Sequence, residues 1–173
     1  MTNILIAGIG GQGSIFAARV LGETALRQTL NVRGSETIGM AQRGGSVVSH
    51  VRMKPPHEIC GFRGDPGETE IASPMILPGK ADVLIALDPT EGERGRHFLR
   101  EGGLFVCCDA TQRARIIQAC GAKSLNAALL GMAAQMGAFP FALEDLAETL
   151  RTFGKPQFAE MNLKALHMGA EMG

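Results

Sequence analysis

The chain has 173 residues, of which 45% are hydrophobic and 20% charged, and its 17 basic residues balance its 17 acidic residues. This length favours a single domain over residues 1–173 with a sizeable core. The balanced charge excludes a strong overall attraction to nucleic acid or to an anionic membrane. A chain without Trp or Tyr also lacks the usual stacking platforms for single-stranded nucleic acid.

Membrane, secretion and metal signals are missing from the sequence. No stretch approaches the roughly 18 apolar residues of a membrane span, and residues 1–3 lead into an apolar run without the basic region of a signal peptide. The cysteines form no C-x-x-C pair, which argues against a zinc or iron–sulfur site built from them alone; they are Cys60, Cys107, Cys108 and Cys120. We expect reduced thiols, no bound metal and a cytoplasmic location.

The first half of the chain predicts three strands and one helix. An apolar run at residues 3–7 precedes glycines, as in a strand buried on both faces, and apolar residues recur at helical spacing from Ser14. A second strand is expected from Leu30 to about Gly34, and a third over residues 46–53. Residues 54–70 are rich in Pro and Gly and predict a loop.

The second half predicts two more strands and a helical end. The strands are expected at residues 81–87 and 104–108, separated by a helix over residues 90–100 that ends at Gly102 and Gly103. Helices are then expected at about residues 124–136, 143–153 and 156–172. This order indicates an α/β fold in three layers, α/β/α. The second and third strands are joined without a crossover helix, so we expect them to run antiparallel and the sheet to be mixed.

The sequence GIGGQG links the first strand to the first helix. It fits the G-x-G-x-x-G pattern of dinucleotide-binding turns with Gly8, Gly10 and Gly13, and Glu36 lies near the place of a ribose-binding acid. The missing crossover helix argues against NAD or FAD, and the motif carries two further residues, Gly11 and Gln12. Three interpretations stay open: a nucleotide site, a tight packing turn, and a loop that meets a ligand or partner subunit.

A second glycine-rich segment precedes the third strand. It joins a cation to two glycines in the run Gln42, Arg43, Gly44, Gly45 and Ser46. An arginine fork binds carboxylate or phosphate, and glycine lets a backbone approach closely. Because ligands of open α/β sheets bind at the carboxyl ends of strands, we expect this segment to lie beside the glycine turn. The two segments together are the predicted cofactor-binding or subunit-interface site.

The remaining candidate residues favour structural roles. Asp88 and Asp109 end later strands, where they could line the same rim or cap a helix. His50 lies among valines and is expected to be a packed histidine. The sequence has no Ser-His-Asp order, no H-E-x-x-H and no P-loop lysine, so we assign no catalytic residue to this chain.

Three segments in succession resemble a known family. They are GIGGQGSIFAARVLGE, ETIGMAQRGGSVVSHVRM and ASPMILPGKADVLIALDP, followed by NAALLG at residues 126–131 and a closing pattern of Asn162, Ala165 and Gly169. Nearly the whole chain resembles the gamma subunit, or gamma domain, of 2-oxoacid:ferredoxin oxidoreductases. The phrase GMAQRGGSVVSHVR resembles the beta subunit of indolepyruvate:ferredoxin oxidoreductase most closely.

That resemblance implies an accessory subunit, inactive when isolated, of a complex that oxidatively decarboxylates a 2-oxoacid to acyl-coenzyme A and reduces ferredoxin. Thiamine diphosphate, Mg²⁺, [4Fe-4S] clusters and coenzyme A are expected in the assembled complex, on thiamine- and cluster-bearing partner subunits. The sequence agrees, since it has no ferredoxin-type cysteine run and no G-D-G…N thiamine motif. The isolated chain could form a homodimer.

Two segments depart from the indolepyruvate branch. Residues 54–70 are longer and richer in Pro and Gly, and the region after Asp109 is shorter. We therefore expect a 2-oxoacid substrate without specifying indolepyruvate. The alternative function from another class is a stand-alone NAD- or FAD-binding regulatory or redox domain.

Overall fold

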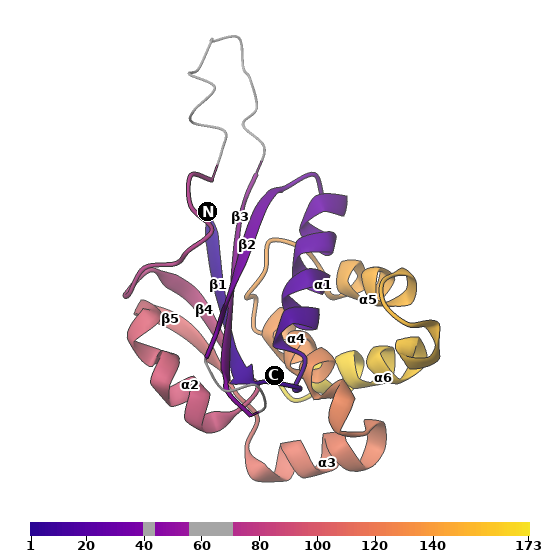
Figure 1. Cartoon of the computed structure of the whole chain (residues 1–173). Coiled ribbons are helices and arrows are strands. Elements are labelled where there is room, and N and C mark those ends of the chain that lie inside the picture. Colours follow the sequence, from indigo (N-terminus) through magenta and orange to yellow (C-terminus); the bar gives the residue numbers. More distant parts are fainter. Residues whose placement is uncertain (40–43, 56–70) are drawn as a thin grey trace.

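The computed structural model describes residues 1–39, 44–55 and 71–173, and in them strands and helices form three layers (Figure 1). One mixed five-stranded sheet has the order β2-β3-β1-β4-β5. Its strands are β1 (Thr2–Ile9), β2 (Asn31–Ile38), β3 (Ser46–Lys54), β4 (Ala81–Ala86) and β5 (Leu99–Val106). The described helices are α1 (Ser14–Arg27), α2 (Pro89–Gly95), α3 (Ala110–Cys120), α4 (Leu125–Gln135), α5 (Leu143–Thr152) and α6 (Ala159–Ala170).

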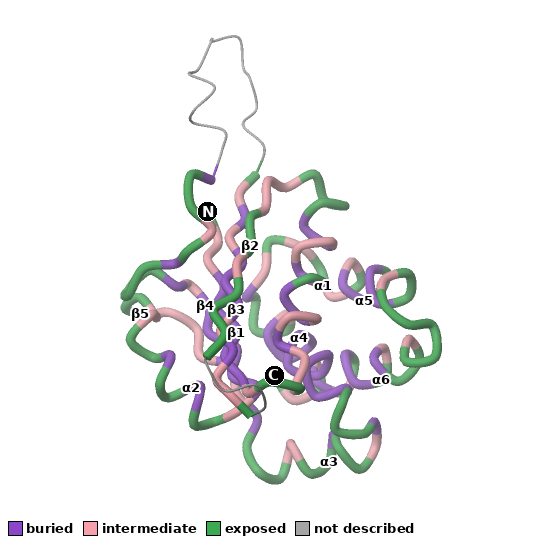
Figure 2. Tube along the Cα trace, in the orientation of Figure 1, coloured by how far each residue is buried: buried purple, intermediate pink, exposed green. Residues whose placement is uncertain are grey.

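The two faces of the sheet are covered unequally. Side chains alternate along β1, so Ile4 and Ile6 pack into the large core beneath α1 and α4, while Leu5 and Ala7 pack into a smaller core with Leu84. Figure 1 shows α1, α4, α5 and α6 on one side of the sheet and α2 on the other. Burial follows this arrangement and is densest along β1, β4 and α4 (Figure 2). The expected three-layer α/β fold is confirmed.

The order of the strands follows from a hairpin inserted beside β1. β2 pairs antiparallel with β3, as expected, and the N–H of Gly39 donates to the carbonyl of Ser46 at 2.8 Å to close the hairpin. β3 also pairs antiparallel with β1, whereas β1–β4 and β4–β5 are parallel. β3 therefore lies between β1 and β2, which α1 joins, whereas the link from β2 to β3 is too short for a crossover helix.

Three boundaries differ from the sequence-based expectation. β2 does not end near Gly34 but continues to Ile38, because β3 supplies a pairing partner as far as Val47. The expected helix over residues 90–100 ends at Gly95, and β5 begins at Leu99, opposite Ala81.

Gly102 and Gly103 do not end a helix but lie inside β5, where the pairing with β4 shifts by a bulge. Helix α3 was not expected, although Asp109 and Gln112 form a capping box at its start.

Helices α4 and α6 cross at very short range, and glycine makes this possible. A Cβ on Gly131 would overlap the carbonyl oxygen of Leu166, and one on Gly169 would overlap the carbonyl oxygen of Ala128. The backbones therefore touch directly, which explains the almost continuous burial of α4. Among the described helices, none is long and apolar enough to cross a membrane.

Candidate functional site

The glycine turn connects β1 to α1 through residues 10–13. Gly11 and Gly13 adopt left-handed backbone angles, with φ of 98° and 84°, which favour glycine. The main-chain N–H of Gln12 donates to the carbonyl of Ile9 at 3.1 Å, and the Ile9 N–H donates to Gln12 Oε1 at 2.9 Å. Gln12 thus closes the turn with both its backbone and its side chain.

Close packing fixes glycine at two further positions of the motif. A Cβ on Gly8 would lie 2.9 Å from Gln12 Oε1 and 3.1 Å from the Cβ of Leu87. A Cβ on Gly13 would overlap Nδ2 of Asn126, which donates to the Gly13 carbonyl at 3.3 Å. These contacts support the interpretation as a packing turn for this part of the motif.

Gly10 differs from its neighbours, because none of the described residues requires it to lack a side chain. It is exposed, its φ is not left-handed, and a Cβ would meet only Gly45 O at 3.7 Å, Gly44 N at 3.9 Å and Val47 Cγ2 at 4.0 Å. Fold packing alone does not explain a glycine here.

The structure brings the two predicted segments together. The N–H of Gly10 donates to the carbonyl of Gly45 at 2.9 Å, and Ile9 lies opposite Ser46 where β1 and β3 pair. Gly44 has a left-handed φ of 71°. Gln42 and Arg43 lie outside the described residues. The eight described residues of the predicted site therefore gather at the carboxyl end of β1, and we call this surface the glycine rim (Gly8–Gly13 and Gly44–Ser46).

Glu36 is not placed to bind the ribose of a dinucleotide at the glycine turn. Glu36 is exposed on β2, the edge strand, and β3 lies between β2 and β1. In a dinucleotide fold the ribose-binding acid ends the strand beside the first one, close to the glycine turn. Because the hairpin moves Glu36 one strand further away, the acid and the turn do not form the expected pair.

The other candidates have structural roles. Asp88 caps α2 by accepting hydrogen bonds from the N–H groups of Thr90 and Glu91 at 2.9 and 3.2 Å. Asp109 caps α3. His50 is 2% exposed, and its Nδ1 accepts from the Ile76 N–H at 3.2 Å. Burial lowers the pKa of His50. The packed histidine is confirmed.

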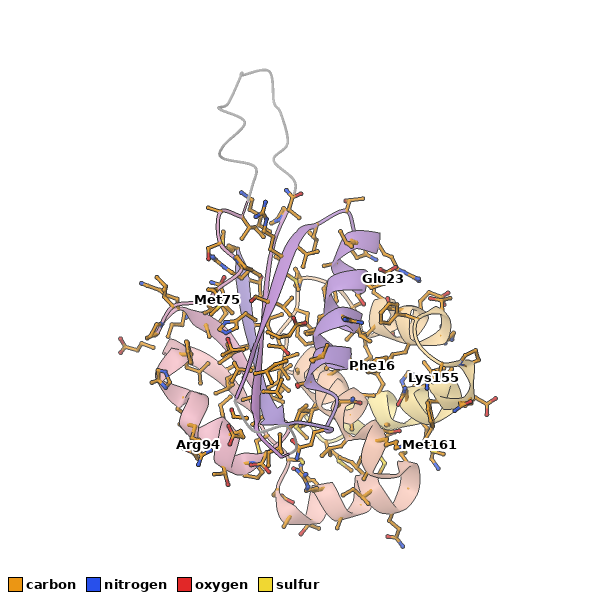
Figure 3. The ribbon with its side chains drawn as sticks, viewed as in Figure 1. Phe16, Glu23, Met75, Arg94, Lys155 and Met161 are labelled. Carbon is orange, nitrogen blue, oxygen red and sulfur yellow. The ribbon has the colours of Figure 1, made fainter. Side chains whose placement is uncertain are left out.

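Sequence reasoning missed a cavity of about 300 Å³ beside the rim. It lies between the glycine turn, the start of α4 and the segment that leads into α6, and its walls include Phe16, Lys123, Lys155 and Asn162. Figure 3 shows Phe16 and Lys155 on the same side of the sheet. No local sequence pattern signals this site. Phe16 and Lys123 are more than 100 residues apart in sequence, and the packing of the helices brings them together.

The described cysteines are free thiols; they are Cys107, Cys108 and Cys120. Burial raises the pKa of Cys107 and of Cys108, which favours the protonated form at neutral pH. Within residues 1–39, 44–55 and 71–173, no three His, Cys, Asp or Glu side chains are grouped as metal ligands. Cys60 and His57 lie outside the described residues.

Comparison with known proteins gives one consistent result. The family model described as pyruvate ferredoxin/flavodoxin oxidoreductase matches residues 3–172. The chain is 30% identical to indolepyruvate oxidoreductase subunit IorB of Pyrococcus horikoshii, over 98% of this chain and 94% of that protein. It is 31% identical to IorB of Archaeoglobus fulgidus, over 96% and 92%.

Among solved structures, the gamma subunit of a keto/oxoacid ferredoxin oxidoreductase from Geobacter sulfurreducens shares the fold. Its TM-score is 0.73 at 22% identity, with 99% of this chain and 97% of that chain covered. The family model covers residues 3–172, which include the residues of both the rim and the cavity walls. The chain therefore belongs to the pyruvate ferredoxin/flavodoxin oxidoreductase family.

Proposed function

We propose that this chain is an accessory, gamma-type subunit of a 2-oxoacid:ferredoxin oxidoreductase, and that the glycine rim meets the partner subunit or an anionic part of its cofactor or substrate. The assembled complex would oxidatively decarboxylate a 2-oxoacid to acyl-coenzyme A and reduce ferredoxin. The full-length similarity to proteins named IorB supports the role of a subunit. The choice of 2-oxoacid is left open.

One observation carries the rim proposal: Gly10 is exposed, sterically free and hydrogen-bonded to a second glycine segment. A glycine that packing does not require indicates that something approaches its backbone closely from outside. The neighbouring Gly44 and Gly45 extend the same side-chain-free surface to the start of β3. A partner backbone or a phosphate could lie directly against it.

The described residues do not fit the metal cofactors of such a complex. A [4Fe-4S] cluster takes four cysteine thiolates, whereas the described residues contain three thiols, Cys107, Cys108 and Cys120. Burial also raises the pKa of Cys107 and of Cys108, which disfavours the thiolate. The sequence has no G-D-G…N thiamine motif, and no three His, Cys, Asp or Glu side chains are grouped among the described residues. We therefore propose that partner subunits hold thiamine diphosphate and the clusters.

Co-expression with a thiamine- and cluster-bearing subunit tests the assignment. We expect the two chains to purify together and to show 2-oxoacid- and coenzyme A-dependent reduction of ferredoxin. Failure to form a complex, with no gain in this activity, would contradict the proposal. Coenzyme A and ferredoxin are omitted in turn as controls.

Gly10→Ala tests the rim separately. Since its Cβ would make only ordinary contacts, the variant should fold like the wild type yet associate about tenfold more weakly with the partner, or turn over more slowly. Gly22→Ala on α1 is the control, because its Cβ meets nothing within 4 Å and the residue lies outside the rim. Arg43→Ala extends the test to the rest of the predicted site. If Gly10→Ala and Arg43→Ala both leave assembly and turnover unchanged, the proposal that this site meets a partner or a ligand is refuted.

A further inference from the structure

The cavity beside the glycine turn contains buried polar groups that no part of the described fold satisfies. Ser124 and Asn162 line it and are 3% and 9% exposed. Neither side chain makes a hydrogen bond within the part of the chain that the structure describes. Their polar atoms remain accessible from the cavity, since the fully enclosed side-chain atom without a partner among the described residues is Ser49 Oγ. The two side chains therefore offer unused hydrogen-bonding groups to a polar ligand in the cavity.

The charge at the cavity indicates the sign of that ligand. Lys123 and Lys155 both lie on its wall and are exposed at its mouth, and its described lining contains no carboxylate. The turn adds Gly11 and Gly13, whose N–H groups have no hydrogen-bond partner among the described residues. Backbone N–H groups exposed by left-handed glycines form concave anion sites.

The remaining walls are aromatic. Phe16 stacks on Phe153 with ring centroids 6.2 Å apart, and Phe158 also lines the cavity. Nζ of Lys123 lies 5.6 Å from the Phe158 ring centroid, so one cation is placed over one ring. Gly154 keeps the space open, since a Cβ there would lie 3.1 Å from the Phe16 ring. The ligand therefore needs a flat apolar part next to its charge.

We propose that this cavity binds a small organic anion that joins a carboxylate to one aromatic ring. Lys123 and Lys155 would hold the carboxylate, Ser124 and Asn162 would share its hydrogen bonds, and the phenylalanine rings would cover the apolar part. A volume of about 300 Å³ suits one ring with a short acidic tail and is too small for a dinucleotide. The inference goes beyond the proposed function, because it concerns a ligand of this chain alone.

Calorimetric titration of the full chain with 3-phenylpropionate tests the proposal. We expect saturable 1:1 binding, and affinity about tenfold weaker for the neutral 3-phenylpropanamide and for inorganic phosphate, which each lack one of the two features. The Lys123→Gln/Lys155→Gln variant should lose affinity by a similar factor, and Asn162→Leu should weaken binding by removing an amide from the cavity wall.

Lys164→Gln is the matched control, because it removes one positive charge from α6 outside this cavity and should bind like the wild type. If Asn162→Leu fails to fold, the Lys123→Gln/Lys155→Gln variant still tests the proposal, since it changes only exposed side chains. The proposal is overturned if the free chain shows no saturable binding. Equal affinity for phosphate, or unchanged affinity in the lysine variant, also overturns it.

Discussion

Asn126 ties the start of α4 to the glycine turn: its Nδ2 donates to the carbonyl of Gly13 at 3.3 Å and fills the space where a Cβ of residue 13 would lie. Gly13→Ala should therefore lower the free energy of unfolding by about 2–4 kcal/mol, through overlap and through its left-handed φ of 84°. Urea unfolding checks this. Gly22→Ala should be neutral or stabilising by about 0.5–1 kcal/mol.

A double variant separates the two causes. Asn126→Ala removes the overlapping amide, so Gly13→Ala should cost less in that background and leave mainly the backbone strain. Additive free energies of unfolding would show that the contact between the two residues does not matter.

The crossing of α4 and α6 should be the most sensitive part of the fold to added volume. Gly131→Ala or Gly169→Ala places a methyl group on the backbone of the facing helix, which cannot move like a flexible side chain. We expect each to cost at least about 3 kcal/mol or to prevent folding. Thermal unfolding, monitored by circular dichroism, measures this destabilisation. Melting temperatures equal to that of Gly22→Ala would contradict the close crossing of α4 and α6.

Gln12 should tolerate replacement only by residues that keep its acceptor. Gln12→Glu retains an oxygen for the Ile9 N–H and should unfold within about 0.5 kcal/mol of the wild type. Gln12→Leu leaves that N–H without its partner and should lose about 1 kcal/mol. If the two variants are equally stable in urea, the side chain does not close the turn.

His50 should make stability depend on pH. Burial lowers its pKa below the ordinary value of about 6.5, and its Nδ1 accepts a hydrogen bond only when unprotonated. The unfolded chain then binds the proton more readily. The contribution of His50 is thus present above about pH 6.5 and is lost as pH falls through the lowered pKa of the folded state.

Urea unfolding at about pH 7.5 and about pH 5.5 measures the effect. His50→Gln removes the titrating group, so its stability should change less between the two conditions than that of the wild type. The exposed His167→Gln is the control and should retain the wild-type difference. An equal change in all three proteins would assign the dependence to other groups.

The sequence predicts those features that neighbouring residues determine. The apolar run before GIGGQG and the helical spacing after it place β1, the turn and α1, and the short link before Ser46 makes β3 antiparallel. The contact between Gly10 and Gly45 could be expected because both segments end at one edge of the sheet. In each case chain geometry leaves few alternatives.

Features that depend on distant partners could not be predicted. β5 begins at Leu99 because Ala81 lies opposite, and local propensity at Arg100 does not show that. The cavity needs Phe16 and Asn162 in one place, and the packing of α1, α4 and α6 brings them there. Glu36 has suitable spacing along the chain, yet an inserted strand removes it from the turn.

The inserted hairpin also has a consequence for how the chain folds. β1 is synthesised first, but its sheet partners begin only at Ser46 and Ala81. A nascent chain therefore carries β1 without a neighbour until β3 has emerged, whereas β2 finds its partner locally. The Gly10–Gly45 hydrogen bond therefore requires residues that are synthesised after the glycine turn, whereas the contacts of Gln12 close that turn within residues 9–12.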